Sequence, residues 1–253
     1  MRVYIGCCGF TMSRRRYYTL FDTVELQETF YNPPRSERLR RLRGEAPELF
    51  VFNMKAWQAI THPPNLATWR RSRFTIPKDL ADRYGFLRPT KENFNAWESV
   101  KDAAKAIQAR VVIIQLPPSF KFSETNLRNA KEFLDSITPT PFIVGLELRG
   151  NWRAHEEEVK EIVGLSNSIV HVVDPFKWRP VLLREVTYFR LHGRNGEVNY
   201  RYRYTDSDLA ELLSVVKNYS AISSEVYVLF NNVSMRNDGL RFKGLCTSSK
   251  QGQ

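Results

Sequence analysis

Short apolar runs alternate with amphipathic segments along the whole chain. Eight runs have the length of a β-strand: Val3–Gly9, Thr23–Tyr31, Phe50–Lys55, Arg110–Leu116, Phe142–Arg149, Ile169–Asp174, the start of Val186–Gly196, and Val226–Asn232. Helical segments are predicted between most of them, over Glu37–Arg43, Lys91–Ala109, Ser123–Ser136, Ala154–Val163 and Thr205–Lys217. Strands that alternate with helices pair in parallel. Eight such units in 253 residues predict an α/β fold, a single (β/α)8 TIM barrel.

One stretch interrupts this alternation. Trp57–Pro89 is rich in Arg and Pro and has no clean period. We therefore expect an extended irregular insertion, with short helices, after the third strand. No linker or low-complexity tract divides the rest of the chain. We expect one barrel domain over residues 1–246 and a polar C-terminal tail over residues 247–253.

The seventh run carries polar side chains on one face. Successive side chains of a strand point to opposite faces, so Tyr188, Arg190 and His192 share one face. Phe189 and Leu191 lie on the other face, which suits packing against helices. Burial of Arg and His costs free energy unless they are paired. We therefore expect other strands to supply partners for them inside the barrel.

Other runs also end in polar residues, and a (β/α)8 barrel has its site at the C-terminal ends of its strands. The predicted catalytic residues there are Glu147, His192, Arg149 and Arg190. The predicted substrate-binding residues are Lys55, Glu25, Gln115, Tyr188, Asn231, Tyr200, Arg201 and Arg203. A carboxylate two residues from a guanidinium, as in Glu147-x-Arg149, suits an acid or base beside an anion clamp.

A structural role stays open for the same residues. The alternative is a buried ion-pair network that only fixes the barrel, made of Glu25, Glu147, Arg149 and Arg190. Such pairs stabilise less than apolar packing does, which favours function. His171 can be a satisfied core histidine, and Asp174 can be a turn residue. Lys55 can contact phosphate or pair with Glu25, and His62 can pack within a loop.

The chain is strongly basic, with 38 Lys and Arg against 27 Asp and Glu and a net charge of +11. This charge makes nucleic acid, DNA or RNA, a candidate partner, although an Arg-rich solvated surface is the plainer explanation. Cations and aromatic rings interleave in Asn199–Tyr204, which suits phosphate contacts and base stacking. We expect Arg14–Tyr18 on the same face, and Trp69–Arg73 can join it.

Further features limit the class of protein. No apolar run approaches the roughly 18 residues of a membrane span, and the start lacks a signal peptide's apolar region. We expect a soluble, cytoplasmic protein without a membrane partner. Three cysteines, of which Cys7 and Cys8 are adjacent, do not form a disulfide framework or a zinc knuckle. They favour a reducing compartment.

No cofactor is certain from the sequence, and a divalent metal ion, Mg²⁺, Mn²⁺ or Zn²⁺, is one possibility. The candidate ligands are Glu147, His171, Asp174 and His192. The sequence has no His-x-His or His-Glu-x-x-His pattern and no carboxylate-dense cluster. The metal therefore stays one alternative among others.

Motifs spread over nearly the whole chain resemble one family. They are Tyr4–Phe10, Val24–Tyr31 with Pro34, Thr61-His62, Gln115–Pro118, Glu147-x-Arg149-x-x-Trp152, Tyr188–Gly193 and Phe230–Asn232. Together they resemble the YecE-like family, domain-of-unknown-function family seventy-two, whose members are TIM barrels. The resemblance implies the fold and no secure activity. This chain departs from the family at Gln27-Glu28, where Asn-Ser is usual.

The family's barrel is similar to that of endonuclease IV, which uses a metal cluster on DNA, and this likeness concerns the fold alone. Three hypotheses follow. The first is a nucleic-acid-processing hydrolase, a phosphodiesterase or nuclease, in which Lys55, Arg149 and Arg190 hold phosphate while Glu147 and His192 move protons or hold a metal ion. The second is an enzyme that uses these residues on a phosphorylated or carboxylated metabolite. The third is a non-catalytic nucleic-acid binding module. A basic aromatic rim favours the first and third, and a closed pocket favours the second.

Overall fold

The structure, a computed structural model, describes residues 2–251, with side chains for residues 2–248. The described chain divides into two compact units. The first comprises residues 2–25, 46–51 and 172–251, and the second comprises residues 26–45 and 52–171. Each unit is a part of the barrel with its own strands and helices. The division into one barrel domain and a tail stays a prediction.

Four parallel strands form the sheet of the first unit. Their order is β7 (Val186–Leu191), β8 (Glu225–Phe230), β1 (Arg2–Cys7) and β2 (Thr23–Leu26). β1 pairs with β8 along its full length, so the first and last strands of the chain are neighbours. A closed (β/α)8 barrel requires this pairing. Every residue of β7 is buried, as in a parallel sheet covered on both faces.

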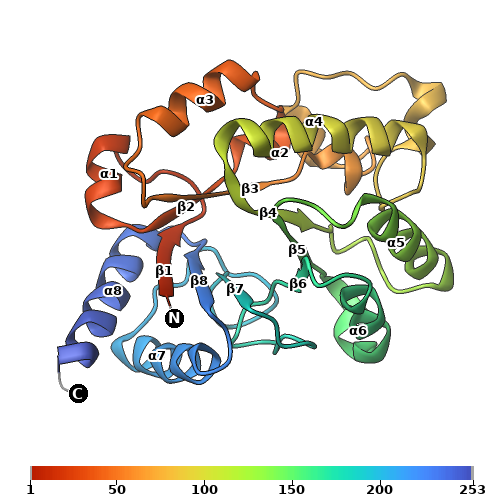
Figure 1. The fold of residues 1–253 in the computed structure, drawn as a ribbon. Coiled ribbons are helices and arrows are strands. Elements are labelled where there is room, and N and C mark those ends of the chain that lie inside the picture. The colour runs from red at the N-terminus through yellow and green to blue at the C-terminus, as the bar shows by residue number, and fades with distance from the viewer. Residues whose placement is uncertain (1, 252–253) are drawn as a thin grey trace. The chain divides into compact units, whose positions relative to one another are not determined.

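Three helices accompany these strands: α1 (Arg14–Leu20), α7 (Asp206–Ser220) and α8 (Met235–Gln251). Figure 1 shows α7 and α8 side by side next to β8. Helix α7 begins where the sequence predicts, because Thr205 and Asp208 form a reciprocal capping box. Helices α1 and α8 were not expected. Helix α8 includes residues 247–251 of the expected polar tail, whereas residues 252–253 lie outside the described residues.

The second unit also holds four parallel strands. They are β3 (Val51–Lys55), β4 (Ala109–Gln115), β5 (Ile143–Glu147) and β6 (Ile169–His171), and each pairs with the next. Their last residues are Lys55, Gln115, Glu147 and His171. Four consecutive strands thus end in a polar side chain, at the barrel end that carries sites in this fold.

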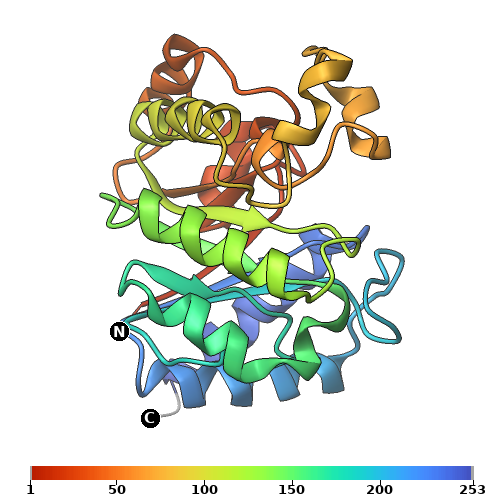
Figure 2. The same cartoon turned by 90° about the vertical axis from the view of Figure 1, so that its right-hand side faces the viewer.

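The helices of the second unit are α2 (Glu28–Tyr31), α3 (Ser36–Gly44), α4 (Lys91–Ile107), α5 (Glu124–Ile137) and α6 (Glu156–Gly164). Between β3 and α4 lie the short 3-10 helices η1 (Gln58–Ile60), η2 (Ala67–Arg71) and η3 (Lys78–Arg83), and η4 (Gly150–Ala154) follows β5. Figure 2 shows the gold segment with η2 and η3 beside α2 and α4. Thr90 and Ser123 cap α4 and α5 with their side chains.

The fold class is the predicted (β/α)8 barrel, and several strand ends differ from the expected ones. The second strand ends at Leu26 because Glu28–Tyr31 is helical. There the Thr29 hydroxyl donates to the carbonyl groups of Leu26 and Lys55, which holds the turn. The predicted strands five, six and eight were too long, and end at Glu147, His171 and Phe230. None of the described helices has the length and apolar composition needed to cross a membrane.

Candidate functional site

Arg190, on β7, is paired with Glu25 of its own unit, which also accepts from Tyr188. Its Nε donates to Glu25 Oε2 at 3.0 Å and its Nη2 to Glu25 Oε1 at 2.9 Å. The Tyr188 hydroxyl donates to Glu25 Oε2 at 3.0 Å. All three residues are buried, with at most 1% of each exposed. The expected partner of Arg190 is therefore present, and this geometry suits the structural alternative.

Cys8 lies against the same pair, with its Sγ 3.8 Å from Arg190 Nη2. Burial raises the pKa of the Cys8 thiol well above its ordinary value, and the Glu25 carboxylate adds a smaller effect in the same direction. Burial also raises the pKa of the neighbouring Cys7 thiol to about 12. Both thiols are therefore kept protonated, which makes them poor nucleophiles and poor metal ligands.

Asp174 holds the residues that follow β7. Its Oδ2 accepts from the backbone N–H of His192 at 3.0 Å and lies 3.2 Å from Lys177 Nζ, while its Oδ1 accepts from the Phe176 N–H. Burial raises the pKa of Asp174, whereas Lys177 and the two backbone donors act in the opposite direction. Asp174 is thus the turn residue of the structural alternative, and it contacts the backbone of His192 rather than its ring.

Gly193 follows β7 and leads to the Tyr–Arg segment (Asn199–Tyr204), and any other residue at position 193 would be strained. Gly193 has φ +81°, and an added Cβ would lie 2.2 Å from the Asn199 carbonyl oxygen. The Gly193 N–H donates to the Tyr204 hydroxyl at 2.8 Å, and Tyr204 is almost fully buried. Tyr200 is 47% exposed, with its ring centroid 6.1 Å from that of His192.

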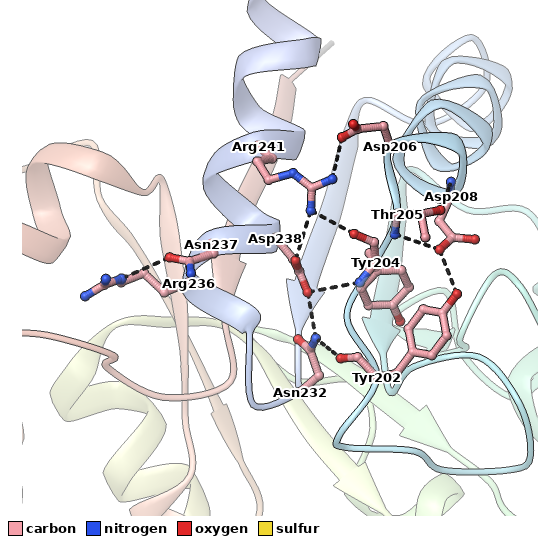
Figure 3. Close-up of polar contacts among 10 residues, drawn as sticks. All are labelled: Tyr202, Tyr204, Thr205, Asp206, Asp208, Asn232, Arg236, Asn237, Asp238 and Arg241. Carbon is pink, nitrogen blue, oxygen red and sulfur yellow. Dashed lines mark hydrogen bonds and ion pairs between the residues drawn. The ribbon is translucent and has the colours of Figure 1, made fainter.

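Figure 3 shows how this segment is attached to α7 and α8. Asp238 accepts from Asn232 Nδ2 at 2.7 Å and from the Tyr204 N–H at 3.3 Å. The Tyr202 hydroxyl donates to Asp208 Oδ2 at 2.7 Å, and Arg241 donates to the Tyr204 carbonyl. Tyr202 and Tyr204 therefore have structural contacts. Three exposed residues of the segment remain for a ligand: Tyr200, Arg201 and Arg203.

Glu147, the last residue of β5, forms the centre of a second cluster, in the second unit. Arg149 approaches a single oxygen of this carboxylate, with Nε 2.8 Å and Nη2 2.6 Å from Glu147 Oε1. Their side chains are 7% and 12% exposed. Burial lowers the pKa of His171, the last residue of β6, to about 3, although the nearby Glu147 carboxylate acts in the opposite direction. A neutral imidazole therefore lies near enough to this carboxylate to be influenced by its charge.

His62 extends this cluster towards β3. Lys55 Nζ lies over the Phe30 ring, 3.8 Å from its centroid, and the Phe30 and His62 rings meet edge to face at 4.9 Å. The Thr61 hydroxyl and His62 Nδ1 are hydrogen-bonded at 2.7 Å. Burial lowers the pKa of His62 to about 3, and Lys55 and Arg149 add to this effect. The potential at His62 is therefore positive, which favours an anion.

The structure thus gathers the predicted residues into one group in each unit. Gln115 lies beside Glu147 in the register of β4 and β5 and is half-buried. Asn231 follows β8, and its N–H donates to the Leu191 carbonyl. His192 is buried. The predicted convergence of Glu147 and Arg149 with Arg190 and His192 stays a prediction.

The metal hypothesis gains no support from side-chain geometry. Within the part of the chain that the structure describes, no three His, Cys, Asp or Glu side chains gather where they could hold a metal ion. The four candidate ligands, Glu147, His171, Asp174 and His192, therefore do not fit a metal centre. The contacts described above give Glu147 and Asp174 cationic neighbours instead.

Residues 5–242 match the family described as protein of unknown function DUF72. The chain belongs to this family. The predicted resemblance is thereby confirmed over nearly the whole chain. The UPF0759 protein YunF of Bacillus subtilis (strain 168) is similar to this DUF72 chain, with 25% identity over 270 residues that cover 92% of this chain and 89% of that protein.

Solved structures with the same fold are also similar to this DUF72 chain. A DUF72 family protein from Thermotoga maritima MSB8 has a TM-score of 0.74 and 24% identity, and the match covers 98% of this chain and 100% of that one. A D-tagatose 3-epimerase-like protein has a TM-score of 0.61 and 13% identity, and the match covers 99% and 97%. At these identities the likeness concerns the fold, and it supports the (β/α)8 class.

Two residues of the second cluster were not in the predicted site. His62 was considered only as a loop residue, and Phe30 was assigned to a strand. The Thr61-His62 motif was a signal for the first, because it belongs to the family resemblance. Phe30 also belongs to that resemblance, through Val24–Tyr31, but its contact with Lys55 arises only when the chain turns after Leu26.

Proposed function

We propose that this chain is an enzyme that binds an anionic group of its substrate, a phosphate or a carboxylate, at the ends of β3 to β6. Glu147 and His171 would move protons in the reaction. This class of enzyme is broader than the nucleases and phosphodiesterases, and it includes both. It also includes a small phosphorylated or carboxylated metabolite as substrate.

One observation carries the proposal. Two buried imidazoles, His62 and His171, have pKa values of about 3 in the same unit as the Glu147–Arg149 pair. Ionisable groups shifted this far by burial and by specific charged neighbours concentrate at functional sites. Here they stand at or next to strand ends that carry sites in this fold. A core built for rigidity alone gains little from four such side chains.

Different residues of the cluster would bind the anion and move the proton. Lys55 and Arg149 create the positive potential at His62, and a substrate anion would be attracted there. Arg149 contacts one oxygen of Glu147 and so fixes the direction of the carboxylate. His171 is neutral at physiological pH. A substrate anion bound beside it would raise its pKa from about 3 and let the imidazole accept a proton in the reaction.

The test is a search for turnover followed by a matched pair of variants. The substrates are bis(p-nitrophenyl) phosphate, p-nitrophenyl phosphate and a set of phosphorylated and carboxylated sugars, with Mg²⁺, Mn²⁺, Zn²⁺ or chelator. Glu147→Gln should lower the rate by about 10²-fold or more, as loss of a general acid or base does. Glu132→Gln is the control, because it makes the same change on the exposed surface of α5.

Melting curves must accompany these rates, because Glu147 also neutralises Arg149. A folded Glu147→Gln protein that keeps full turnover would contradict the proposal. The same holds for His171→Gln, which keeps polarity and removes proton transfer.

A further inference from the structure

An Arg-rich segment of the second unit is attached firmly beside the cluster around Lys55. The Trp69 indole N–H donates to the His62 carbonyl at 2.8 Å. Asn32 is bonded to the segment twice, because its Nδ2 donates to the Arg71 carbonyl and its Oδ1 accepts from the Arg73 N–H. Residues 69–73 therefore have a defined position next to α2 and His62.

The cations of this segment face solvent without counter-ions. Arg70 and Arg73 are exposed, and neither forms an ion pair with any carboxylate of residues 2–248. On α3, in contrast, Arg38 is 3.0 Å from Glu28 and Arg41 is 3.5 Å from Glu45. Arg38 and Arg41 thus have a carboxylate within 4 Å, whereas Arg70 and Arg73 have none among the described side chains and can contact a polyanion.

Aromatic rings accompany these cations. Arg71 lies over the Tyr31 ring, 4.8 Å from its centroid, and also donates to the Tyr31 hydroxyl at 2.8 Å. Phe74 is 48% exposed, and its ring contacts that of Trp57 at an interplanar angle of 54° with 4.9 Å between centroids. An exposed aromatic ring beside arginines is a surface on which a planar base can stack.

A continuous series of contacts joins this surface to the buried cluster. The Tyr31 and Phe30 rings meet edge to face at 5.0 Å, and Lys55 Nζ lies over Phe30. The series runs from the exposed Arg71 through the rings of Tyr31 and Phe30 to Lys55, which is 6% exposed.

We propose that Arg70, Arg71, Arg73 and Phe74, called here the η2 surface, bind a single-stranded nucleic acid. Its phosphates would contact the guanidinium groups, and a base would stack on Phe74. The inference names the substrate class of the proposed site, and in that respect it rests on the proposed function. An anionic membrane or an acidic protein would contact the same charges, and the binding experiment therefore tests both.

The η2 surface is a second candidate stacking surface beside the Tyr–Arg segment. Tyr202 and Tyr204 of that segment have structural contacts in Figure 3, and Tyr200, Arg201 and Arg203 are exposed.

The experiment measures fluorescence anisotropy of labelled single-stranded DNA and RNA of about 20 nucleotides over a range of salt concentrations. Arg70→Ala/Arg73→Ala should lower the slope of log K against log salt by about 2, one for each lost phosphate contact. Phe74→Ala should weaken binding by about 5-fold or more through lost stacking. Arg38→Ala/Arg41→Ala is the control, since it removes the same charge from paired, exposed arginines of the same unit.

Three results would overturn the inference. They are no binding at low salt, an equal loss in the two double variants, or equally tight binding of phosphatidylserine vesicles or polyglutamate. Failure of the proposed function looks different. If the oligonucleotides bind at the η2 surface and no Glu147-dependent turnover occurs, the binding inference is confirmed and the chain is a binding module. If turnover of small phosphate esters depends on Glu147 and the oligonucleotides do not bind, the proposed enzyme activity is confirmed and the η2 surface is refuted.

Discussion

Glu25 and Arg190 form a two-point ion pair in which neither side chain is more than 1% exposed. The pair joins β2 to β7, with Tyr188 as a third member. Water is excluded from both partners. Loss of one partner therefore leaves the other as a buried, uncompensated charge, which is costly in free energy.

We predict that Arg190→Met or Glu25→Leu alone lowers the free energy of unfolding by about 3–5 kcal/mol. The double variant Glu25→Leu/Arg190→Met should be less destabilised than the sum of the two, because it leaves no buried charge. Urea unfolding of the four proteins measures the coupling. Additive effects would contradict the pair's structural role.

The three free cysteines should differ in reactivity. Burial keeps Cys7 and Cys8 protonated, whereas Cys246 on α8 is partly exposed. We expect one thiol to react rapidly with iodoacetamide in the native protein and three after unfolding in denaturant. Cys246→Ser should remove the fast reaction. A fast reaction that persists in Cys246→Ser would show that the sheet around Cys8 opens easily.

Strands with marked patterns could be predicted from the sequence, and helices with weak patterns could not. The polar last residues Lys55, Gln115, Glu147 and His171 were recognised because apolar runs precede them. Helix α8 was missed because Gly239 and Gly244 break its helical pattern. At Gly239 the packing explains the glycine, since an added Cβ would lie 3.0 Å from Phe21 Cε1.

Pairings within the candidate site were only partly accessible. The strand period placed Arg190 inside the barrel and required a partner, which Glu25 supplies. The same period could not show that Tyr204 is buried against Gly193 and Asp238. Those contacts depend on the path of a loop, and alternating Tyr and Arg residues give no information about that path.

Asp238 should anchor the Tyr–Arg segment. It is 2% exposed and accepts from Asn232, the Tyr204 N–H and Arg241. Asp238→Ala leaves these donors without their acceptor, so we expect a loss of about 1–3 kcal/mol in the free energy of unfolding. Limited proteolysis should then cut between residues 194 and 203 faster than in the wild type. Asn237→Ala, on the exposed side of the same helix turn, is the control.

Acid should destabilise the protein before its carboxylates titrate. Burial lowers the pKa of both His62 and His171 from 6.5 to about 3. Between these values the unfolded chain binds more protons than the folded chain does, so stability falls as the pH falls below 6.5. Each histidine contributes a loss of up to about 1.4 kcal/mol per pH unit in this window. Urea unfolding from about pH 7 to about pH 5 measures the slope.

Single variants show whether His62 and His171 cause this dependence of the unfolding free energy on pH. His62→Gln and His171→Gln should each reduce the dependence of the unfolding free energy on pH by close to one proton, because each removes one group that charges only after unfolding. Val170→Ala, at a buried neighbour of His171, should lower stability at every pH and leave the slope unchanged, since it alters packing without altering proton uptake. An unchanged slope in both histidine variants would mean that the imidazoles protonate in the folded state, and the neutral His171 proposed to move a proton would then be wrong.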